Sequence, residues 1–285
     1  MDEQDVVRKA RAFMQGLDLS SIRESLDPYL AKANARVRKE ELGPGESGMV
    51  AEIKGKLVIT VNSHESLERQ RFTICHELGH KVLGLDSNHQ LVPPWGPVKR
   101  DMTEVLCDVF AAELLMPHDH FSAACQDSEP SLKTLLALMD AFKTSFPATG
   151  SRFARLTNVP CAFVNMQGGL VRYATMSTLL RRSGAHIRFK TPIPARSIAA
   201  RLRQAKSSEF QEGGVAQDEW FENWPSGLDL IELSRHHDAS DTTLSLLWFE
   251  EEEAPRMEVD RFGQRVQEDN GLDELTGVLS WEKRR

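Results

Sequence analysis

The stretch FTICHELGHKVLG, residues 72–84, decides how the rest of this chain is interpreted. It places His76 and His80 four residues apart, with Glu77 beside the first histidine. In an α-helix four residues turn through about 400°, so both imidazoles project from one face and can bind a single metal ion. Glu77 is rotated by about 100°, where it can act on a metal-bound water without being a ligand. The spacing therefore predicts a zinc peptidase site.

The residues around this stretch support a buried helix. Most of its other side chains are apolar: Phe72, Ile74, Cys75, Leu78, Val82 and Leu83. Two histidines and a glutamate in a buried helix would cost free energy unless they are paired or coordinated. The pattern predicts a helix from Ser63 to about Leu83, capped by Asn62 or Ser63 and ended by Gly84.

A catalytic zinc needs a third protein ligand and an open fourth position. The stretch TEVLCDVFAAELLMP, residues 103–117, predicts a second helix with Glu104 and Asp108 one turn apart. Glu104 is the preferred third ligand, and Asp108 can accept a hydrogen bond from the outer nitrogen of His76. Glu113 is the rival ligand, but it lies half a turn around the helix and is expected to be a surface or hinge residue. Zinc suits these ligands, although manganese or iron could replace it.

Composition limits the kind of protein further. The 285 residues carry a net charge of −7, so bulk electrostatics do not recruit nucleic acid, and direct DNA binding is not expected. Any DNA contact would have to come from a local basic face. The N-terminus lacks a signal peptide, and no apolar run reaches the ~18 residues of a membrane span. Four unclustered cysteines indicate free thiols and a cytoplasmic protein with no membrane partner. Packing is the expected role of Cys75 and Cys107, with redox sensing as the alternative.

Three further segments are recognisable. MVAEIKGKLVITVN, residues 49–62, alternates apolar positions around Lys54-Gly55 and predicts a β-hairpin. SLKTLLALMDAFKTSFPATGSRFARL, residues 131–156, predicts a helix, a turn and a second helix that carries Arg152 and Arg155. Strand-like and helical segments beyond residue 160 predict a separate α/β domain. Four of its aromatic residues could line a pocket for a small-molecule ligand: Trp220, Phe221, Trp224 and Trp248.

RQRFTICHELGH followed by TEVLCDVFAAELLMP resembles the ImmA/IrrE family of metallopeptidases. The E-x-x-x-D spacing also looks like that of gluzincin-type peptidases. The resemblance implies an α+β chain of three parts. These are a gluzincin-like metallopeptidase domain with a small β-sheet over residues 1–125, a helix-turn-helix-like segment over 126–158, and a GAF-like α/β sensor domain over 159–285.

The same resemblance implies a function. His76, His80 and Glu104 would be the metal ligands and Glu77 the general acid/base. The substrate would be a Cro/cI-type helix-turn-helix repressor, whose cleavage induces a stress or DNA-damage response. The alternative is a DNA-binding transcriptional regulator with a structural or vestigial metal site, which rests on the helix-turn-helix-like segment.

Overall fold

The computed structural model describes residues 1–43, 45–86, 102–125, 128–222, 224 and 229–249. Over these residues the chain combines helices with two separate β-sheets, which confirms the predicted α+β class. Residues 250–285, the last part of the expected third domain, lie outside the described residues, as do His89 and most of the loop that precedes Met102.

The N-terminal region forms three helices: α1 (Glu3–Met14), α2 (Leu19–Ile22) and α3 (Asp27–Lys32). Asp2 caps α1 by accepting a hydrogen bond from the backbone of Asp5, whose side chain accepts one in return. Gly16, with φ of 81°, turns the chain after α1. The apolar face of α1 packs against the helix that carries Glu104.

A three-stranded sheet follows, with the order β1 (Ala35–Glu40), β3 (Lys56–Asn62) and β2 (Gly48–Ile53). Strands β2 and β3 form the expected hairpin, and its turn places Lys54 and Gly55 at φ of 51° and 73°. Strand β1 pairs with β3 in parallel and was not anticipated from the sequence. The sheet therefore has β2 at one edge.

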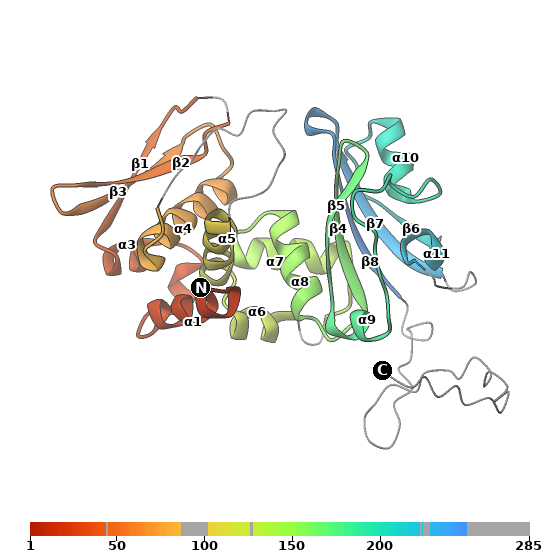
Figure 1. The fold of residues 1–285 in the computed structure, drawn as a ribbon, viewed down its shortest axis with the longest axis horizontal. Helices are drawn as coiled ribbons and strands as arrows, with labels where there is room; N and C mark the ends of the chain where they lie inside the picture. The colour runs from red at the N-terminus through yellow and green to blue at the C-terminus, as the bar shows by residue number, and fades with distance from the viewer. Residues whose placement is uncertain (44, 87–101, 126–127, 223, 225–228, 250–285) are drawn as a thin grey trace, which may run out of the picture.

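The two predicted site helices are present as α4 (Leu67–Leu83) and α5 (Met102–Leu115). The cap of α4 is Ser66, which accepts a hydrogen bond from the backbone of Arg69; the proposed caps Asn62 and Ser63 belong to the preceding strand and turn. Gly84 ends α4 in the left-handed conformation, as predicted, at φ of 69°. The two helices lie side by side (Figure 1).

Three more helices connect this region to the second sheet: α6 (His118–Cys125), α7 (Leu132–Phe142) and α8 (Phe146–Leu156). Lys143 ends α7 in the left-handed conformation, and the chain turns into α8 within three residues. In Figure 1, α7 and α8 lie between the α4–α5 region and the second sheet.

The second sheet has five antiparallel strands in the order β5 (Leu170–Met176), β4 (Cys161–Gln167), β8 (Thr242–Trp248), β7 (Asp229–His237) and β6 (Gln211–Ala216). The helices α9 (Thr178–Arg182), α10 (Ile198–Ala205) and α11 (Gln217–Trp220) belong to the same part of the chain. A short 3₁₀ turn, Asp238–Ser240, joins β7 to β8.

The two faces of this sheet belong to different cores. On β4, Phe163 points into a core that continues through α8 to the N-terminal helices, whereas Ala162 and Val164 point into a second core with α9 and α10. Strand β4 touches α8 at Gly150, where a Cβ would lie only 2.3 Å from the ring of Phe163. The sheet is thereby held directly against the helices that follow the site.

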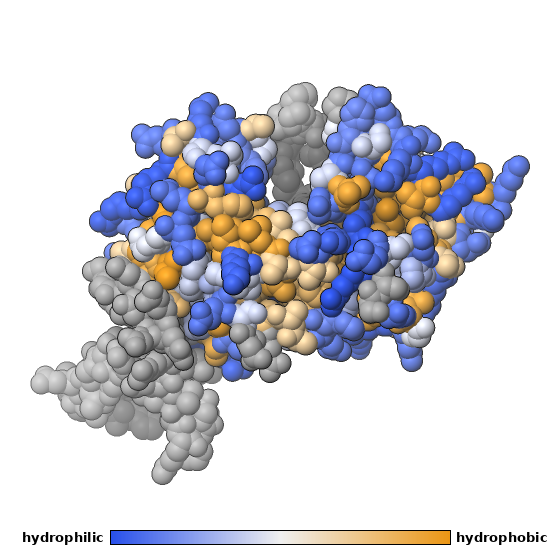
Figure 2. Space-filling view, turned by 180° about the vertical axis from the view of Figure 1, so that it is seen from behind, coloured by the Kyte–Doolittle hydropathy of each residue, from blue (hydrophilic) through white to orange (hydrophobic). Residues whose placement is uncertain are grey.

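On the face shown in Figure 2, hydrophilic residues surround hydrophobic ones that gather on both halves of the molecule. Among the described residues, no helix has both the length and the apolar character needed to cross a bilayer.

Candidate metal centre

The two histidines of α4 and Glu104 of α5 converge on one point. The Nε2 atoms of His76 and His80 are 3.2 Å apart. One carboxylate oxygen of Glu104 lies 3.0 Å from Nε2 of His76, and the other lies 3.5 Å from Nε2 of His80. These atoms are mostly withdrawn from solvent: the side chain of His80 is 1 % exposed and that of His76 is 11 % exposed.

The spacing of these atoms fits a zinc ion. Ligand atoms about 2.0–2.1 Å from zinc at tetrahedral angles lie about 3.3 Å from one another. The three separations lie between 3.0 and 3.5 Å. Two imidazoles and a carboxylate also form a donor set that zinc accepts in catalytic sites. The residues present therefore fit the metal that the sequence predicts.

Asp108 fixes the orientation of His76 from behind. Its carboxylate lies 2.9 Å from Nδ1 of His76, on the side of the ring opposite Glu104. Burial alone would lower the pKa of His76, but the hydrogen bond to Asp108 and the charges of nearby carboxylates outweigh it, so the pKa is raised. With Nδ1 directed at Asp108, Nε2 is the nitrogen that faces the convergence point.

Glu77 and Cys107 complete the surroundings of this point. Glu77 is 1 % exposed, and its charge contributes to the raised pKa of His76. The Sγ atom of Cys107 lies within 4.8 Å of a ring nitrogen of both His76 and His80, so these three residues form a second candidate ligand set. Burial and three surrounding carboxylates raise the pKa of the Cys107 thiol to about 12, which favours its neutral form.

Glycine lets α4 and α5 approach closely enough to build this site. A Cβ at Gly79 would lie 3.3 Å from Cα of Cys107 and 3.3 Å from the ring of Phe110, which is tight packing against a backbone. Because Gly79 is adjacent to His80, the helices touch at the turn that carries the histidines. Glu104 and Cys107 are therefore brought to the histidines by direct contact between the helices.

Comparison with known proteins places this geometry in a family. The model described as the IrrE N-terminal-like domain, a peptidase M78 family, matches residues 30–154, the span that contains both site helices. This part of the chain is similar to the ImmA/IrrE family.

A curated member is the radiation response metalloprotease IrrE of Deinococcus radiodurans, 31 % identical over 111 residues. The match covers 37 % of this chain and 33 % of that protein, so the chain matches only a third of its relative's length.

A solved structure with a similar fold is a Mycobacterium tuberculosis transcriptional regulator. The two superimpose with a TM-score of 0.57 at 14 % identity, over 86 % of this chain and 76 % of that one. At this identity the likeness concerns the fold alone. It extends beyond the ImmA/IrrE-matched span into the five-stranded sheet.

Glu113 is not at the surface, and that expectation was wrong. It is 1 % exposed, and its carboxylate accepts hydrogen bonds from Arg152 of α8, from Nε of Arg11 at 3.2 Å and from the backbone of His118. Arg152 also donates to the carbonyl oxygen of Met116 at 2.7 Å. Glu113 therefore joins three parts of the fold and faces away from the histidines, as its position on the helix requires.

The same contact removes Arg152 from the set of residues that could touch DNA. Its side chain is 10 % exposed and is committed to Glu113. Arg155 is exposed, but it is then the single arginine of α8 that faces solvent. The helix pair α7–α8 thus packs between the two halves of the molecule, and the reason for expecting DNA contacts from α8 is weakened.

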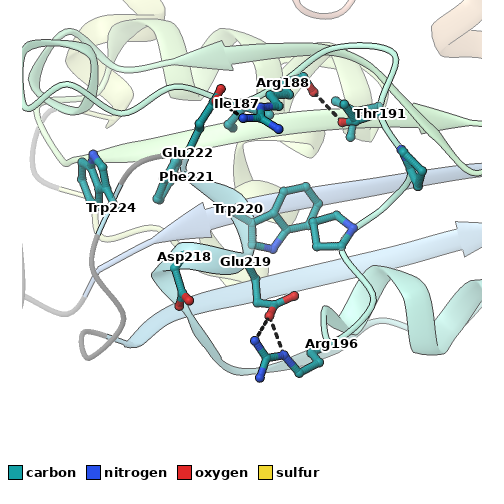
Figure 3. Close-up of a pocket in the computed structure, with 13 residues that line it drawn as sticks. Ile187, Arg188, Thr191, Arg196, Asp218, Glu219, Trp220, Phe221, Glu222 and Trp224 are labelled. Atoms are coloured by element: carbon teal, nitrogen blue, oxygen red, sulfur yellow. Dashed lines mark hydrogen bonds and ion pairs between the residues drawn. The ribbon is translucent and has the colours of Figure 1, made fainter.

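The aromatic residues of the second half only partly meet the pocket expectation. Trp220, Phe221 and Trp224 line a cavity of about 450 Å³, shown in Figure 3. Its rims carry two ion pairs, one between Arg188 and Glu222 and one between Arg196 and Glu219. Trp248 is not part of it.

Trp248 packs instead into the core on the other face of the sheet. The indole of Trp220 is held by a hydrogen bond from Nε1 to the buried carboxylate of Glu232 at 3.0 Å. Glu232 also accepts hydrogen bonds from the backbone nitrogens of Ile198 and Ala199 at the start of α10. These hydrogen bonds therefore fix the position of Trp220, which lines the cavity.

Proposed function

We propose that this chain is a cytoplasmic zinc-dependent endopeptidase that cleaves a Cro/cI-type helix-turn-helix repressor and so induces a stress or DNA-damage response. His76, His80 and Glu104 are the proposed metal ligands, Glu77 the general acid/base and Asp108 the residue that orients His76. The observation that carries the proposal is the convergence of two imidazole Nε2 atoms and one carboxylate within 3.0–3.5 Å.

The chemistry divides between the metal and the chain. Zinc, when bound, would polarise the scissile carbonyl and make a water nucleophilic near neutral pH. Glu77, next to His76 and withdrawn from solvent, takes the proton from the attacking water and delivers it to the leaving amine. Asp108 keeps Nε2 of His76 directed at the site by accepting the hydrogen on Nδ1.

The edge strand β2 supplies a surface for an extended substrate. Its first residue, Gly48, lies against α4, because a Cβ there would be 2.5 Å from Cγ2 of Thr73. Further along, Glu52 binds Lys81 of α4 at 2.8 Å. Four strand residues and eight helix residues both span about 12–13 Å, so β2 runs beside the turn that carries His76 and His80. A substrate strand that pairs with β2 would lie next to the metal ligands.

The decisive variant is Glu77→Gln, tested on repressor-like proteins encoded beside this gene. Cleavage should be lost while zinc content, measured by atomic absorption, stays at the wild-type level, because the amide keeps the shape but takes no proton. Glu68, a partly exposed residue in the first turn of the same helix, provides the matched control, Glu68→Gln, which should cleave normally. Persistent cleavage by the Glu77 variant, or cleavage that a chelator leaves untouched, would contradict the mechanism.

The part of the chain with the five-stranded sheet is proposed to be a GAF-like sensor domain that binds a small ligand and controls the peptidase. The support is the cavity floored by Trp220, whose size lies within the range of small-molecule sites. A ligand specific to the folded state must raise the melting temperature. A metabolite screen by thermal shift would find such a ligand, and a flat result across the screen would count against a sensor.

A further inference from the structure

The net charge of −7 conceals a strong segregation of charge along the chain. Residues 141–208 contain twelve of the 35 lysines and arginines and none of the 42 acidic residues. This stretch runs from the end of α7 to the loop after α10. A local basic face is therefore present in a chain whose overall charge is acidic, and the fold decides which of these cations remain available to a partner.

Several cations in this stretch are neutralised within the fold. Arg152 binds Glu113, Arg203 binds Asp241, and the two arginines at the rim of the cavity bind glutamates. Six others are exposed and form no ion pair with any residue that the structure describes: Arg201 of α10, and the five residues Arg155, Arg172, Arg181, Arg182 and Lys190.

These five residues gather around β5, the edge strand of the sheet. Arg172 belongs to β5, and the backbone of Lys190 donates to the carbonyl of Val171 at 2.8 Å. Arg181 and Arg182 are in α9, which follows β5 directly. Arg155 is one turn after Ser151, whose hydroxyl lies 2.9 Å from that of Thr175 on β5. We call this set the β5 basic face.

A bulge at the edge strand turns one of these side chains outward. Val171 pairs with Met166 and Tyr173 pairs with Asn165, so Arg172 is an extra residue with no partner on β4. Bulges at sheet edges redirect side chains and end regular pairing. The outward position of the Arg172 side chain thus follows from the shift in register between β5 and β4.

Exposed apolar side chains lie among the cations. Phe189 is 48 % exposed next to Lys190, Tyr173 is 42 % exposed next to Arg172, and Leu179 is 37 % exposed in α9. These are the three exposed large hydrophobic residues of the described second sheet region. Sites for single-stranded nucleic acid have two components. Cationic side chains contact the phosphate backbone of the nucleic acid, and aromatic rings stack against its bases.

An added peptide strand fits this edge less well. Residues 190–193 already occupy the start of β5: the backbone of Val171 donates to Thr191, and that of Ile193 donates to Gly169. The backbone groups that an acidic peptide would use there are taken. Side-chain recognition of a polyanion remains available along the seven-residue strand, a length of about 20 Å that accommodates several nucleotides.

We propose that the β5 basic face is a binding site for single-stranded nucleic acid, contacted through Arg155, Arg172, Arg181, Arg182 and Lys190, with Phe189 as a stacking platform. The site is separate from the metal centre, and of the α7–α8 helix pair it includes only Arg155. It does not depend on the peptidase proposal.

The test measures binding of a fluorescent oligothymidylate to the full-length protein by anisotropy across a salt series. The double variant Arg181→Gln/Arg182→Gln should weaken binding at least tenfold and reduce the slope of log K against log salt by about 1.4, since each lost phosphate contact contributes about 0.7. Phe189→Ala should weaken binding at least fivefold with the slope unchanged, because stacking releases no counterions.

The matched control is Arg36→Gln/Arg38→Gln, which removes the same charge from two exposed arginines of β1. It should bind as the wild type does. An equal loss in this control would show that only net charge matters and would overturn the site. A duplex of the same length that binds as tightly as the single strand would overturn the role of stacking. Equal binding of polyglutamate would overturn nucleic acid as the ligand in favour of an acidic peptide.

Discussion

At the scale of single residues, Glu104 and Cys107 are rivals for the third metal-ligand position. Both lie on α5 within reach of the histidines. A thiolate at Cys107 would add negative charge to a site that already holds several carboxylates, and its raised pKa of about 12 reflects that cost. Glu104 already places its two carboxylate oxygens 3.0 Å from Nε2 of His76 and 3.5 Å from Nε2 of His80.

Cobalt substitution separates these two residues. The cobalt-loaded protein should lack a thiolate-to-metal charge-transfer band, and Cys107→Ser should leave cobalt affinity within about threefold. Glu104→Gln should lower affinity by more than the roughly 10–100-fold that loss of an outer partner costs. A charge-transfer band that disappears in the Cys107 variant would assign the ligand to the thiol.

Buried thiols give the metal-free fold a dependence on alkaline pH. Burial raises the pKa of Cys75 from 9.0 to about 12 and also raises that of Cys161. The folded state therefore holds these protons more tightly than the unfolded chain does. This stability is fully present below pH 9 and is lost as the pH rises from about 9 toward 12, by about 1.4 kcal/mol for each thiol per pH unit.

Urea unfolding of the metal-free protein at about pH 8 and about pH 10 measures this loss. The variant Cys75→Ala should show a smaller fall between the two pH values than the wild type does. An unchanged fall would mean that ionisation of other groups controls the alkaline limit.

At the scale of helices and strands, local sequence patterns predicted the elements whose formation depends on neighbouring residues in the chain. The apolar spacing, Gly84 and the H-E-x-x-H pattern predicted α4, and the i, i+4 carboxylates Glu104 and Asp108 predicted which face of α5 lies against His76. Both the parallel strand β1 and the burial of Glu113 depend on contacts across the chain, which no local pattern carries. The net charge of the whole chain likewise did not reveal the basic stretch around β5, because acidic residues elsewhere offset its cations.

The close contact between α8 and β4 at Gly150 can be tested by adding a side-chain atom there. Gly150→Ala would place a Cβ 2.3 Å from the ring of Phe163, so the helix or the ring must shift, at a cost of about 1–3 kcal/mol. Gly214→Ala on β6 meets nothing within 4 Å and serves as the control. Chemical denaturation should show a lower free energy of unfolding for the first variant only. Equal stability of the two would show that α8 does not press on the sheet.

At the scale of the whole molecule, the buried pair of Glu113 and Arg152 connects α5 to the helices beside the second sheet. Removing Arg152 leaves the buried carboxylate of Glu113 with the half-exposed Arg11 as its remaining cationic partner, so Arg152→Met should lower the free energy of unfolding by about 3 kcal/mol, the low end of the range for a broken buried pair. Arg8→Met, at the exposed pair with Asp5, should change it by less than about 1 kcal/mol.

A double variant distinguishes the pair from simple loss of packing. Arg152→Met combined with Glu113→Leu removes both charges, and it should be more stable than Arg152→Met alone. If the double variant were the less stable of the two, the loss of stability in Arg152→Met would come from poorer packing and not from the charge left on Glu113.

Helix α5 carries both Glu104, the proposed metal ligand, and Glu113 of the buried pair. A movement at one end of this helix is therefore transmitted to the other end. Glu104 and Glu113 are nine residues apart on one continuous helix, a separation of about 13.5 Å. Because Glu113 is fastened to α8, and α8 lies directly on the sheet at Gly150, a tilt of α5 by about 4° about that end would displace Glu104 by about 1 Å. A displacement of that size can change catalytic rates by about a hundredfold. The positions of the atoms in the candidate metal centre therefore depend on the far end of α5 as well as on the residues around the convergence point.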